Sequence, residues 1–489
     1  MDVSKTAVGP LGDGDLLIGG TWRSAGDGRT FAVFDPATGE AIREVSSASA
    51  ADARAAIEAA DAAAAAWRRT PPRRRSEILH ETFRAMHAHG EQLAELITLE
   101  NGKALRDARA EVAYAAEFFR WFAEEAVRIG SSFNTAPAGG YRHVVVKQPV
   151  GITAHITPWN FPAAMATRKI APALAAGCTV LLKPAPETPL TALAVAGLMA
   201  EAGLPAGVLQ VLPSDRAADV GETWLNDDRV RKLSFTGSTG TGRLLLHQAA
   251  DRIVNTTLEL GGNGPFIVCA DADVDAAVRG AMEAKMRGGG EVCVAANRFY
   301  VHASVAEEFT AKFGAAMAAV RTGPGRQDGV ELGPMINPAA VKKIGSLVQD
   351  AIDRGARIAA QGQVPEGEGW YYPATVLSDV PVDAQCMREE IFGPVAPVAT
   401  FTDEDEAVRL ANDTEFGLVA FVYSRDVGRA LRLAERIESG MVGVNRGLVS
   451  DPAAPFGGVK ESGLGREGAA AGIEAFLETK YIALDWPEQ

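Results

Sequence analysis

One stretch of the sequence, residues 151–183, shows the unit from which the fold is built: GITAHITPWNFPAAMATRKIAPALAAGCTVLLK. It starts with a short run rich in β-branched residues (152–156), continues with apolar residues at helical spacing (163–176), and ends with a second apolar run (179–182). This order of strand, helix and strand is typical of a crossover unit, in which the two strands lie parallel. The stretch therefore predicts a parallel sheet that is covered by helices.

The same alternation extends through the rest of the chain. Further strands are predicted at 208–212, 231–235 and 265–269, and further helices at 189–202, 216–226 and 240–250. A second alternating region begins near Glu259, with predicted helices at 273–286, 304–320 and 337–354 and predicted strands at 297–302, 395–401, 418–424 and 441–445. The fold class that follows is α/β, with two such regions.

The two ends of the chain carry different patterns. Before residue 128 the sequence predicts a strand at 16–22 and helices at 48–66, 76–100 and 102–127. The segment FNTAPAGGY (133–141) predicts a break because it holds Pro and paired Gly, and a strand is expected at 143–150. The last segment, KYIALDW (480–486), predicts one more strand, whose exposed edge could pair with another subunit.

The composition is that of a large folded protein. With 489 residues and a usual domain size of about 150 residues, the chain has room for roughly three structural units. The 48 Lys and Arg residues face 62 Asp and Glu residues, so the formal net charge is -14. This charge repels a nucleic-acid backbone or an anionic membrane, and the one basic run, 68–75, is explained as the solvated end of a helix. We therefore expect neither nucleic acid nor membrane as a partner.

The cysteines and the first residues bear on the compartment. Cys178, Cys269, Cys293 and Cys386 are too far apart for a CxxC pair or a metal-ligand spacing, so no metal site is predicted. Four such cysteines favour a reducing compartment. The first residues lack the basic and apolar segments of a signal peptide, and no window holds the roughly 18 apolar residues of a membrane span. These observations predict a cytoplasmic protein.

The motif LELGGN (258–263) holds a candidate general base. Glu259 lies between two leucines and beside a Gly pair that allows close approach of the backbone. Apolar surroundings raise the pKa of a carboxyl group, which suits proton transfer near neutral pH. An ordinary Glu at a strand end, bonded to backbone amides, fits these six residues equally well.

Cys293 follows three glycines in the sequence GGGEVC (288–293). Backbone amides that come close to the thiol could stabilise a thiolate or an oxyanion. A lone Cys is usually a small core residue, and this is the better interpretation of Cys178, Cys269 and Cys386. The glycine run favours a functional role for Cys293.

Two turns could hold a ligand or be purely structural. The sequence FTGSTGTG (235–242) follows a predicted strand and precedes a predicted helix, where free amides can bind a phosphate. Its glycine order is not the GxGxxG fingerprint, and such a turn is often only a helix cap. The motif PWNFP (158–162) could be a rigid turn, or it could fix Asn160 as an amide donor.

Taken together, these motifs resemble a known family. PWNFP, LLKPA, FTGST, LELGGN, the Gly-flanked Cys, EEIFGPV and PFGGVKESGLGRE follow one another in this order along essentially the whole chain. They resemble the NAD(P)-dependent aldehyde dehydrogenase superfamily. The stretches TRKIAPALAAGCTVLLKPA, ELGGNGPFIV, ANDTEFGL and KESGLGREG are most similar to its succinate-semialdehyde dehydrogenase branch.

The resemblance implies a fold in three parts. A Rossmann-like NAD(P)-binding domain would comprise 1–127 and 148–258, and an α/β catalytic domain would comprise 259–460. A bridging β element, formed by 128–147 and 475–489, would join the subunits of a homodimer or homotetramer.

The resemblance also implies a mechanism. The Cys293 thiolate would attack the aldehyde, and the Asn160 side chain with the Cys293 backbone amide would hold the oxyanion. After hydride transfer to the nicotinamide, a water deprotonated by Glu259 would hydrolyse the thioester to the acid.

The same resemblance implies a cofactor site for NADP or NAD. Lys183 would bind the adenosine ribose, Ser238 the pyrophosphate and Glu390 the nicotinamide ribose. Further cofactor contacts are expected from Thr157, Pro158, Trp159, Gly237, Leu260, Gly261 and Phe392.

For the substrate, the resemblance implies that two arginines and a serine, Arg168, Arg287 and Ser450, bind the distal carboxylate of succinic semialdehyde. Surface arginines in ordinary salt bridges are the alternative for either arginine alone.

Glutaric or 2-oxoglutaric semialdehyde is the rival substrate, and a catalytically silent binding or structural relative is the rival class of protein. A CoA-acylating enzyme is a further alternative. Its chemistry would not need the water-activating Glu259, so the presence of Glu259 favours hydrolysis.

Three positions depart from the pattern of similar proteins. Glu291 stands where relatives have Gln, and a carboxylate two residues from the thiol could raise its pKa or repel an anionic substrate. Ala295 stands where relatives often carry a redox-active Cys. Pro186 replaces a Glu that binds the ribose hydroxyls in NAD-preferring relatives, which favours acceptance of NADP.

Overall fold

The crossover unit predicted at 151–183 is present in the computed structural model, which describes residues 14–486. It consists of β7 (Ile152–Ile156), α5 (Pro162–Ala176) and β8 (Thr179–Lys183), and β7 and β8 pair in parallel. Gly177 ends the helix with φ +98°, a left-handed conformation that glycine adopts without strain. All of α5 is buried, as its apolar sequence requires.

The first large sheet is built around this unit. Its eight strands have the order β2-β1-β9-β8-β7-β10-β11-β21 and are mostly parallel, with antiparallel pairs at the edges. The remaining strands are β1 (Leu16–Ile18), β2 (Thr21–Arg23), β9 (Leu209–Val211), β10 (Val230–Thr236), β11 (Asn255–Glu259) and β21 (Gly463–Leu464). Helices α1 (Ala50–Arg69), α2 (Pro72–Ala88), α3 (Gly90–Asn101), α4 (Leu105–Glu125), α6 (Pro189–Glu201), α7 (Ala217–Asn226) and α8 (Thr239–Ala250) belong to this half.

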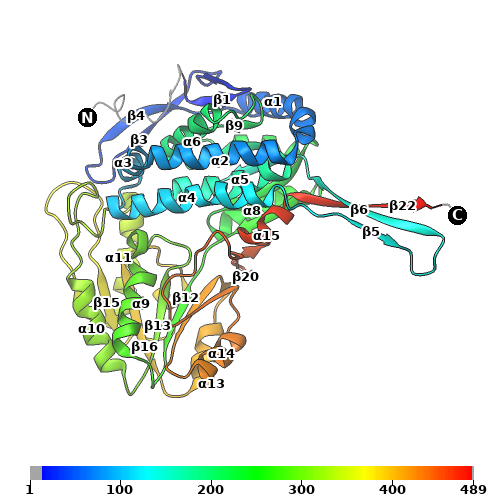
Figure 1. The fold of residues 1–489 in the computed structure, drawn as a ribbon. Coiled ribbons are helices and arrows are strands. Elements are labelled where there is room, and N and C mark those ends of the chain that lie inside the picture. Colours follow the sequence, from blue (N-terminus) through cyan, green and yellow to red (C-terminus); the bar gives the residue numbers. More distant parts are fainter. Residues whose placement is uncertain (1–13, 487–489) are drawn as a thin grey trace.

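The second large sheet lies in the lower part of Figure 1 and has seven strands in the order β14-β15-β16-β13-β12-β18-β19. They are β12 (Gly264–Val268), β13 (Ala296–His302), β14 (Arg357–Gln361), β15 (Thr375–Ser378), β16 (Val395–Phe401), β18 (Val419–Tyr423) and β19 (Met441–Val444). Its helices are α9 (Val274–Met286), α10 (Ala306–Ala318), α11 (Pro338–Asp353), α12 (Gln385–Arg388), α13 (Glu404–Asn412) and α14 (Val427–Arg436). The predicted α/β class with two regions is confirmed.

The two sheets meet at the LELGGN motif. Strand β11 of the first sheet ends at Glu259, and β12 of the second begins at Gly264. Near the C-terminus the chain returns, and Gly463 pairs with Glu259 in antiparallel fashion. The short pair β17 (Phe416–Gly417) and β20 (Val459–Lys460) and the helix α15 (Ala469–Glu474) accompany this return. Residues after β11 therefore lie between the two sheets.

A three-stranded arm projects away from both sheets (Figure 1). Its strands β5 (Ser132–Thr135), β6 (Tyr141–Pro149) and β22 (Leu477–Asp485) have the order β22-β6-β5. Phe133 and Trp486 contact one another edge to face across the arm, with ring centroids 5.8 Å apart. The predicted C-terminal strand is thus present, and one of its edges is free within the described chain.

Several local predictions were wrong. The helix expected at 76–100 is interrupted at His89. The prediction missed this break because apolar residues continue in phase across it, from Met86 to Leu93. The break expected at 133–141 begins inside β5. The strand expected at 16–22 is a hairpin, turned by Gly19 and Gly20 in left-handed conformations. The hairpin of β3 (Thr30–Phe34) and β4 (Ala41–Ser46), strands β14 and β15, and helices α13 and α14 were not predicted.

Candidate active site

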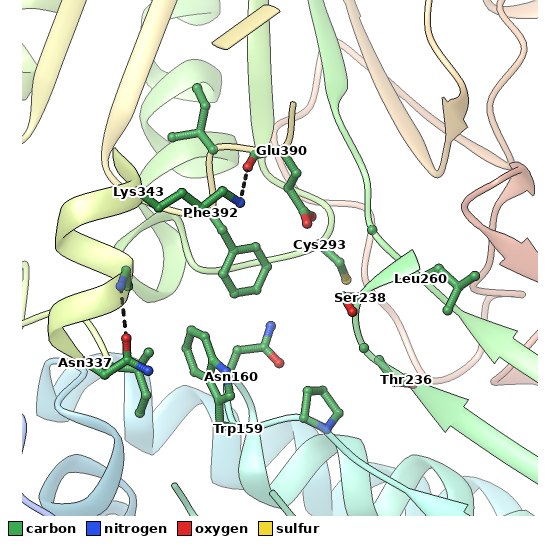
Figure 2. Close-up of a pocket in the computed structure, with 16 residues that line it drawn as sticks. Trp159, Asn160, Thr236, Ser238, Leu260, Cys293, Asn337, Lys343, Glu390 and Phe392 are labelled. Carbon is green, nitrogen blue, oxygen red and sulfur yellow. Dashed lines mark hydrogen bonds between the residues drawn. The ribbon is translucent and has the colours of Figure 1, made fainter. Parts of the chain in front are cut away.

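A cavity of about 270 Å³ lies between the two sheets, at the ends of β7, β10 and β11 (Figure 2). Parallel sheets place their ligand sites at such carboxyl ends, where successive loops converge. The predicted residues that line it are Pro158, Trp159, Asn160, Gly237, Ser238, Leu260, Gly261, Cys293, Glu390 and Phe392. Thr157, Lys183 and Glu259 lie outside its lining.

Two aromatic rings form one wall of the cavity. Trp159 and Phe392 meet edge to face with centroids 5.4 Å apart, and Figure 2 shows both rings beside the Asn160 amide. Phe392 has φ +54°, a conformation that is rare for a residue with a side chain. The loop after Glu390 therefore holds this ring in place at the expense of local backbone strain.

The polar lining fits a dinucleotide. Ser238 is the N-cap of α8, so the positive end of that helix faces the cavity. One oxygen of Glu390 accepts a hydrogen bond from the Gly262 N–H at 3.0 Å, and burial raises the pKa of its carboxyl to about 7. Lys343 Nζ donates to the Glu390 backbone carbonyl at 2.7 Å.

Lys183 lies at the end of β8, beside the PWNFP turn. Its backbone carbonyl accepts from the Thr157 N–H at 3.1 Å. Among residues 14–486, its buried ammonium has one long hydrogen bond, 3.4 Å to the Pro184 carbonyl, and burial lowers its pKa to about 8. A buried ammonium with so weak a hydrogen bond is free to donate to a polar ligand. The adenosine half of NAD(P) would be such a ligand.

The three glycines before Cys293 are needed for the path of the chain. Gly288, Gly289 and Gly290 have φ values of +53°, +67° and +79°. A Cβ on Gly290 would lie 2.3 Å from the carbonyl oxygen of Gly393. Only glycine combines these conformations with this contact, so the run directly determines where the thiol is placed.

Cys293 lies where two cavities meet. It lines the large cavity and also a smaller pocket on the substrate side. Part of the Cys293 side chain is accessible, but protein atoms surround the thiol. This burial raises the pKa of the thiol to about 12, and the Arg168 guanidinium opposes the shift. Burial therefore disfavours the thiolate of Cys293, and the nearby Arg168 guanidinium favours it.

Asn160 is joined directly to the cysteine loop. Its Nδ2 donates to the Glu291 carbonyl at 2.9 Å, and its Oδ1 is buried without a hydrogen-bond partner among the described residues. The second N–H of this amide is left for another acceptor in the cavity. A side chain placed in this way can donate to an oxyanion formed at Cys293.

The Glu291 side chain is buried and accepts a hydrogen bond from the main chain of another loop. Its Oε1 accepts from the Ile336 N–H at 3.2 Å, and burial raises the pKa of the carboxyl to about 8. The group therefore carries a proton at neutral pH. This protonation removes the full negative charge that the sequence suggested beside Cys293.

Glu259 is a buried carboxyl whose two oxygens have no hydrogen-bond partner within residues 14–486. The alternative that backbone amides bind it is therefore wrong. Gly457 provides space for it, because a Cβ there would lie 2.7 Å from Glu259 Oε1. Burial, reinforced by the nearby Glu467, raises the pKa of Glu259 well above its ordinary value, while Lys169 and Arg168 oppose the shift. A carboxyl with a raised pKa takes up a proton more readily than an ordinary Glu, which suits a group that removes a proton from water.

Two charged residues next to Glu259 were not predicted. Lys169 Nζ donates to Glu467 Oε1 at 2.5 Å and to Ser234 Oγ at 3.1 Å. Glu467 Oε2 lies 3.7 Å from Arg168 Nη1. One signal in the sequence could have found Lys169, because a lysine within an apolar helix needs a buried partner.

The substrate-side pocket gathers the three predicted substrate residues. Arg168, Arg287 and Ser450 line it together with Cys293. Arg287 Nη1 donates to Ser450 Oγ at 3.1 Å. The Arg168 guanidinium is buried and lies over the Phe456 ring, 4.1 Å from its centroid. These arginines thus face a common pocket beside the thiol, which the alternative of ordinary surface salt bridges does not explain.

Two features that the described residues lack bear on partners. Within residues 14–486, no helix is long and apolar enough to cross a membrane. The same part of the chain contains no group of three His, Cys, Asp or Glu side chains that could hold a metal ion. All four cysteines are free thiols, and Cys178, Cys269 and Cys386 are buried, as expected of core residues.

Comparisons with known proteins point to one family. The profile described as "Aldehyde dehydrogenase family" matches residues 22–482. A succinate-semialdehyde dehydrogenase of Paenarthrobacter nicotinovorans is 54% identical over 446 residues, 91% of this chain and 99% of that protein. A glutarate-semialdehyde dehydrogenase of Pseudomonas putida is 49% identical, over 96% of this chain and 97% of that protein. An Escherichia coli structure described as an NADP-dependent enzyme has a TM-score of 0.95 at 48% identity, covering 96% of this chain and 98% of that chain.

Proposed function

The chain belongs to the aldehyde dehydrogenase family, and we propose that it oxidises succinic semialdehyde to succinate with NADP or NAD as cofactor. The observation that supports this substrate is the pocket that Arg168, Arg287 and Ser450 line together with Cys293. Two guanidinium groups suit a carboxylate, and a carboxylate that is bound there would leave the aldehyde end of a short chain near the thiol.

Catalysis begins at Cys293. Its thiolate adds to the aldehyde carbon and forms a thiohemiacetal, whose oxyanion accepts hydrogen bonds from the Asn160 side chain and the Cys293 backbone amide. When bound, NAD(P) would accept a hydride from this carbon, and the oxyanion would then collapse to the carbonyl of a thioester on Cys293. Trp159, Ser238 and Glu390 would hold the cofactor in the large cavity, and Lys183 would hold its adenosine end.

Glu259 completes the reaction. Its carboxylate deprotonates the water that hydrolyses the Cys293 thioester, and the acid is released. The raised pKa and the unpaired oxygens support this role, because a carboxylate without fixed partners can accept a proton without breaking other bonds. Glu259 also disfavours a CoA-acylating enzyme, which would need no such base. Together with Cys293 and Asn160, it disfavours a catalytically silent relative as well.

Glutaric semialdehyde is the second candidate substrate, since the relative from Pseudomonas putida is named a glutarate-semialdehyde dehydrogenase. It has the same two functional groups separated by one more methylene, so the same arginines could bind it; 2-oxoglutaric semialdehyde is a third possibility. A single methylene changes the ratio of two kcat/KM values only by about 10- to 200-fold. The enzyme should therefore oxidise both semialdehydes, with different values of kcat/KM.

For the cofactor, we propose that NADP is accepted and supports turnover at least as well as NAD. Pro186 cannot repel a 2′-phosphate as a carboxylate would, and the buried Lys183 ammonium lies three residues before it. The similar structure from Escherichia coli is described as NADP-dependent.

We further propose the division of the chain stated above, with 1–127 and 148–258 binding the cofactor, 259–460 carrying the nucleophile, and 128–147 with 475–489 joining subunits. The exposed Phe133, Tyr481 and Trp486 on the projecting arm support its role in a homodimer or homotetramer. Four free cysteines support a cytoplasmic location.

An aldehyde panel assayed with both cofactors tests the proposal. Succinic semialdehyde should have the highest kcat/KM, followed by glutaric semialdehyde, with uncharged butanal well below both. NADP should support turnover at least as well as NAD. A preference for butanal would refute the carboxylate pocket, and strict dependence on NAD would refute the cofactor proposal.

A further inference from the structure

A short segment between α3 and α4 holds the turn that carries Asn160. Asn101 Nδ2 donates to the Trp159 carbonyl at 3.1 Å, and Lys103 Nζ donates to the Asn160 carbonyl at 2.6 Å. Both side chains are buried, at 2% and 5% exposure. Two consecutive peptide carbonyls of the turn are therefore fixed by one distant segment of the chain.

Glu111 holds the other side of the same turn. Its Oε1 accepts from the N–H groups of Ala163 and Ala164, at 2.9 and 3.3 Å, where α5 begins. Its Oε2 accepts from Lys103 Nζ at 2.5 Å, and both side chains are almost completely buried. The ion pair thus connects the main chain immediately before α5 to its first turn. The Lys103 ammonium also lies 3.9 Å from the centroid of the Phe161 ring.

A buried ion pair is weak evidence for stability, because removing both charges from water is costly. Here Lys103 also bonds to the Asn160 carbonyl and Glu111 to the first amides of α5, so the ion pair holds the main chain on both sides of Asn160. The Asn160 side chain has one fixed hydrogen bond, to the Glu291 carbonyl. Its main chain must therefore be held for the free N–H to keep a constant direction.

The same helix reaches the cysteine loop. Asp107 Oδ2 accepts from the Gly288 N–H at 3.3 Å. Helix α4 therefore contacts the turn of Asn160 in one half of the molecule and the glycine run before Cys293 in the other. The helix thus joins the segment that carries Asn160 to the loop that carries Cys293.

We propose that Lys103, held by Glu111, is a positioning residue for the Asn160 amide, which it directs toward the oxyanion formed at Cys293. The proposal rests on the role of Asn160 in the proposed function. Lys103 itself contacts neither substrate nor cofactor, and it acts through the Asn160 main chain.

A double-mutant cycle tests the proposal. Lys103→Met keeps most of the aliphatic chain and removes the ammonium donor. We expect it to lower kcat and kcat/KM for succinic semialdehyde by similar factors, about 10- to 100-fold, since loss of one oxyanion donor costs about 10²–10³-fold. KM and the dissociation constant for NADP should change less than about 2-fold. In an Asn160→Ala background, Lys103→Met should lower kcat/KM by less than about 2-fold, because the amide that it positions is already gone.

Glu111→Gln provides a second variant if the lysine substitution prevents folding, and it should show the same non-additivity with Asn160→Ala. Glu100→Gln is the matched control. Glu100 is another buried carboxyl of this helical segment, and it accepts from the main chain of Leu190 and Thr191 at 2.8 Å, where α6 begins. It does not contact the Asn160 turn, so kcat/KM should stay close to that of the wild type.

The outcomes distinguish a failure of the positioning role from a failure of the proposed function. If Lys103→Met and Glu111→Gln kept full kcat/KM, or lowered it by the same factor with and without Asn160, the positioning role would be overturned while the proposed function stood. If Asn160→Ala itself had no effect on kcat/KM, the oxyanion role in the proposed function would fail, and the positioning role with it.

Discussion

Arg168 and Tyr114 form a direct hydrogen bond inside the substrate-side pocket, with Arg168 Nη2 2.6 Å from Tyr114 Oη. The guanidinium of Arg287 lies over the ring of the same tyrosine, 5.5 Å from its centroid. Tyr114 thus contacts both of the arginines that would bind the substrate carboxylate. It links them into one cationic surface, although the three residues come from distant segments of the chain.

The first prediction concerns these arginines. Arg287→Ala should lower kcat/KM for succinic semialdehyde by about one to two orders of magnitude, since a hydrogen bond to a charged group contributes roughly 1.5–3 kcal/mol. Butanal has no carboxylate and should lose far less. Arg287 is the cleaner test, because Arg168 also faces Glu467 and its removal would disturb that buried carboxylate. Equal losses on both substrates would show that Arg287 is structural.

The second prediction concerns the nucleophile. Cys293→Ala should abolish aldehyde oxidation and leave NADP binding intact, because only the thiol is lost. Mass spectrometry of the wild type with aldehyde and oxidised cofactor should find a covalent adduct on Cys293. Cys178 and Cys386 are buried and should not react. An adduct on either would contradict the assignment.

The third prediction separates the two chemical stages. Glu259→Gln should still release one equivalent of reduced cofactor in a burst, since hydride transfer precedes the water step. Steady-state turnover should then fall by about two to four orders of magnitude, because the general base is missing. Stopped-flow absorbance measures both phases. A folded variant without a burst would mean that Glu259 acts earlier, for example on the thiol.

The fourth prediction concerns Glu291 and the pH dependence of stability. Burial raises the pKa of this carboxyl from 4.5 to about 8. Between these values the unfolded chain has released the proton that the folded protein still holds, so ionisation progressively favours unfolding as the pH rises. Below about pH 4.5 the effect is absent, and above about pH 8 it is complete.

Glu291→Gln keeps an oxygen acceptor for the Ile336 N–H and cannot ionise. Relative to the wild type, its free energy of unfolding should therefore increase from about pH 5 to pH 8, by up to about 1.4 kcal/mol per pH unit, and then level off. Chemical denaturation at several pH values measures this difference. Parallel curves for the two proteins would show that Glu291 titrates normally in the folded state.

The sequence alone determined the units of the fold and the motifs at their ends. Strands such as β7 and helices such as α5 are recognisable because their periodicity is a local property of the chain. The glycine run before Cys293 was also readable, since consecutive glycines indicate backbone that no other residue can adopt. Where periodicity continues in phase across a break, as at His89, the sequence was misleading.

The tertiary structure alone decided which side chains meet and which of them are charged. Glu259 and Glu291 are both single carboxyl groups beside apolar residues in the sequence. Yet within the described residues Glu259 has no hydrogen-bond partner, whereas Glu291 accepts from the Ile336 main chain. Lys103 contacts the turn of Asn160 across more than fifty residues, and Lys169 pairs with Glu467 from the opposite end of the chain. Burial and pairing depend on packing between distant segments, and the energy of a charge depends on both, so no local pattern contains them.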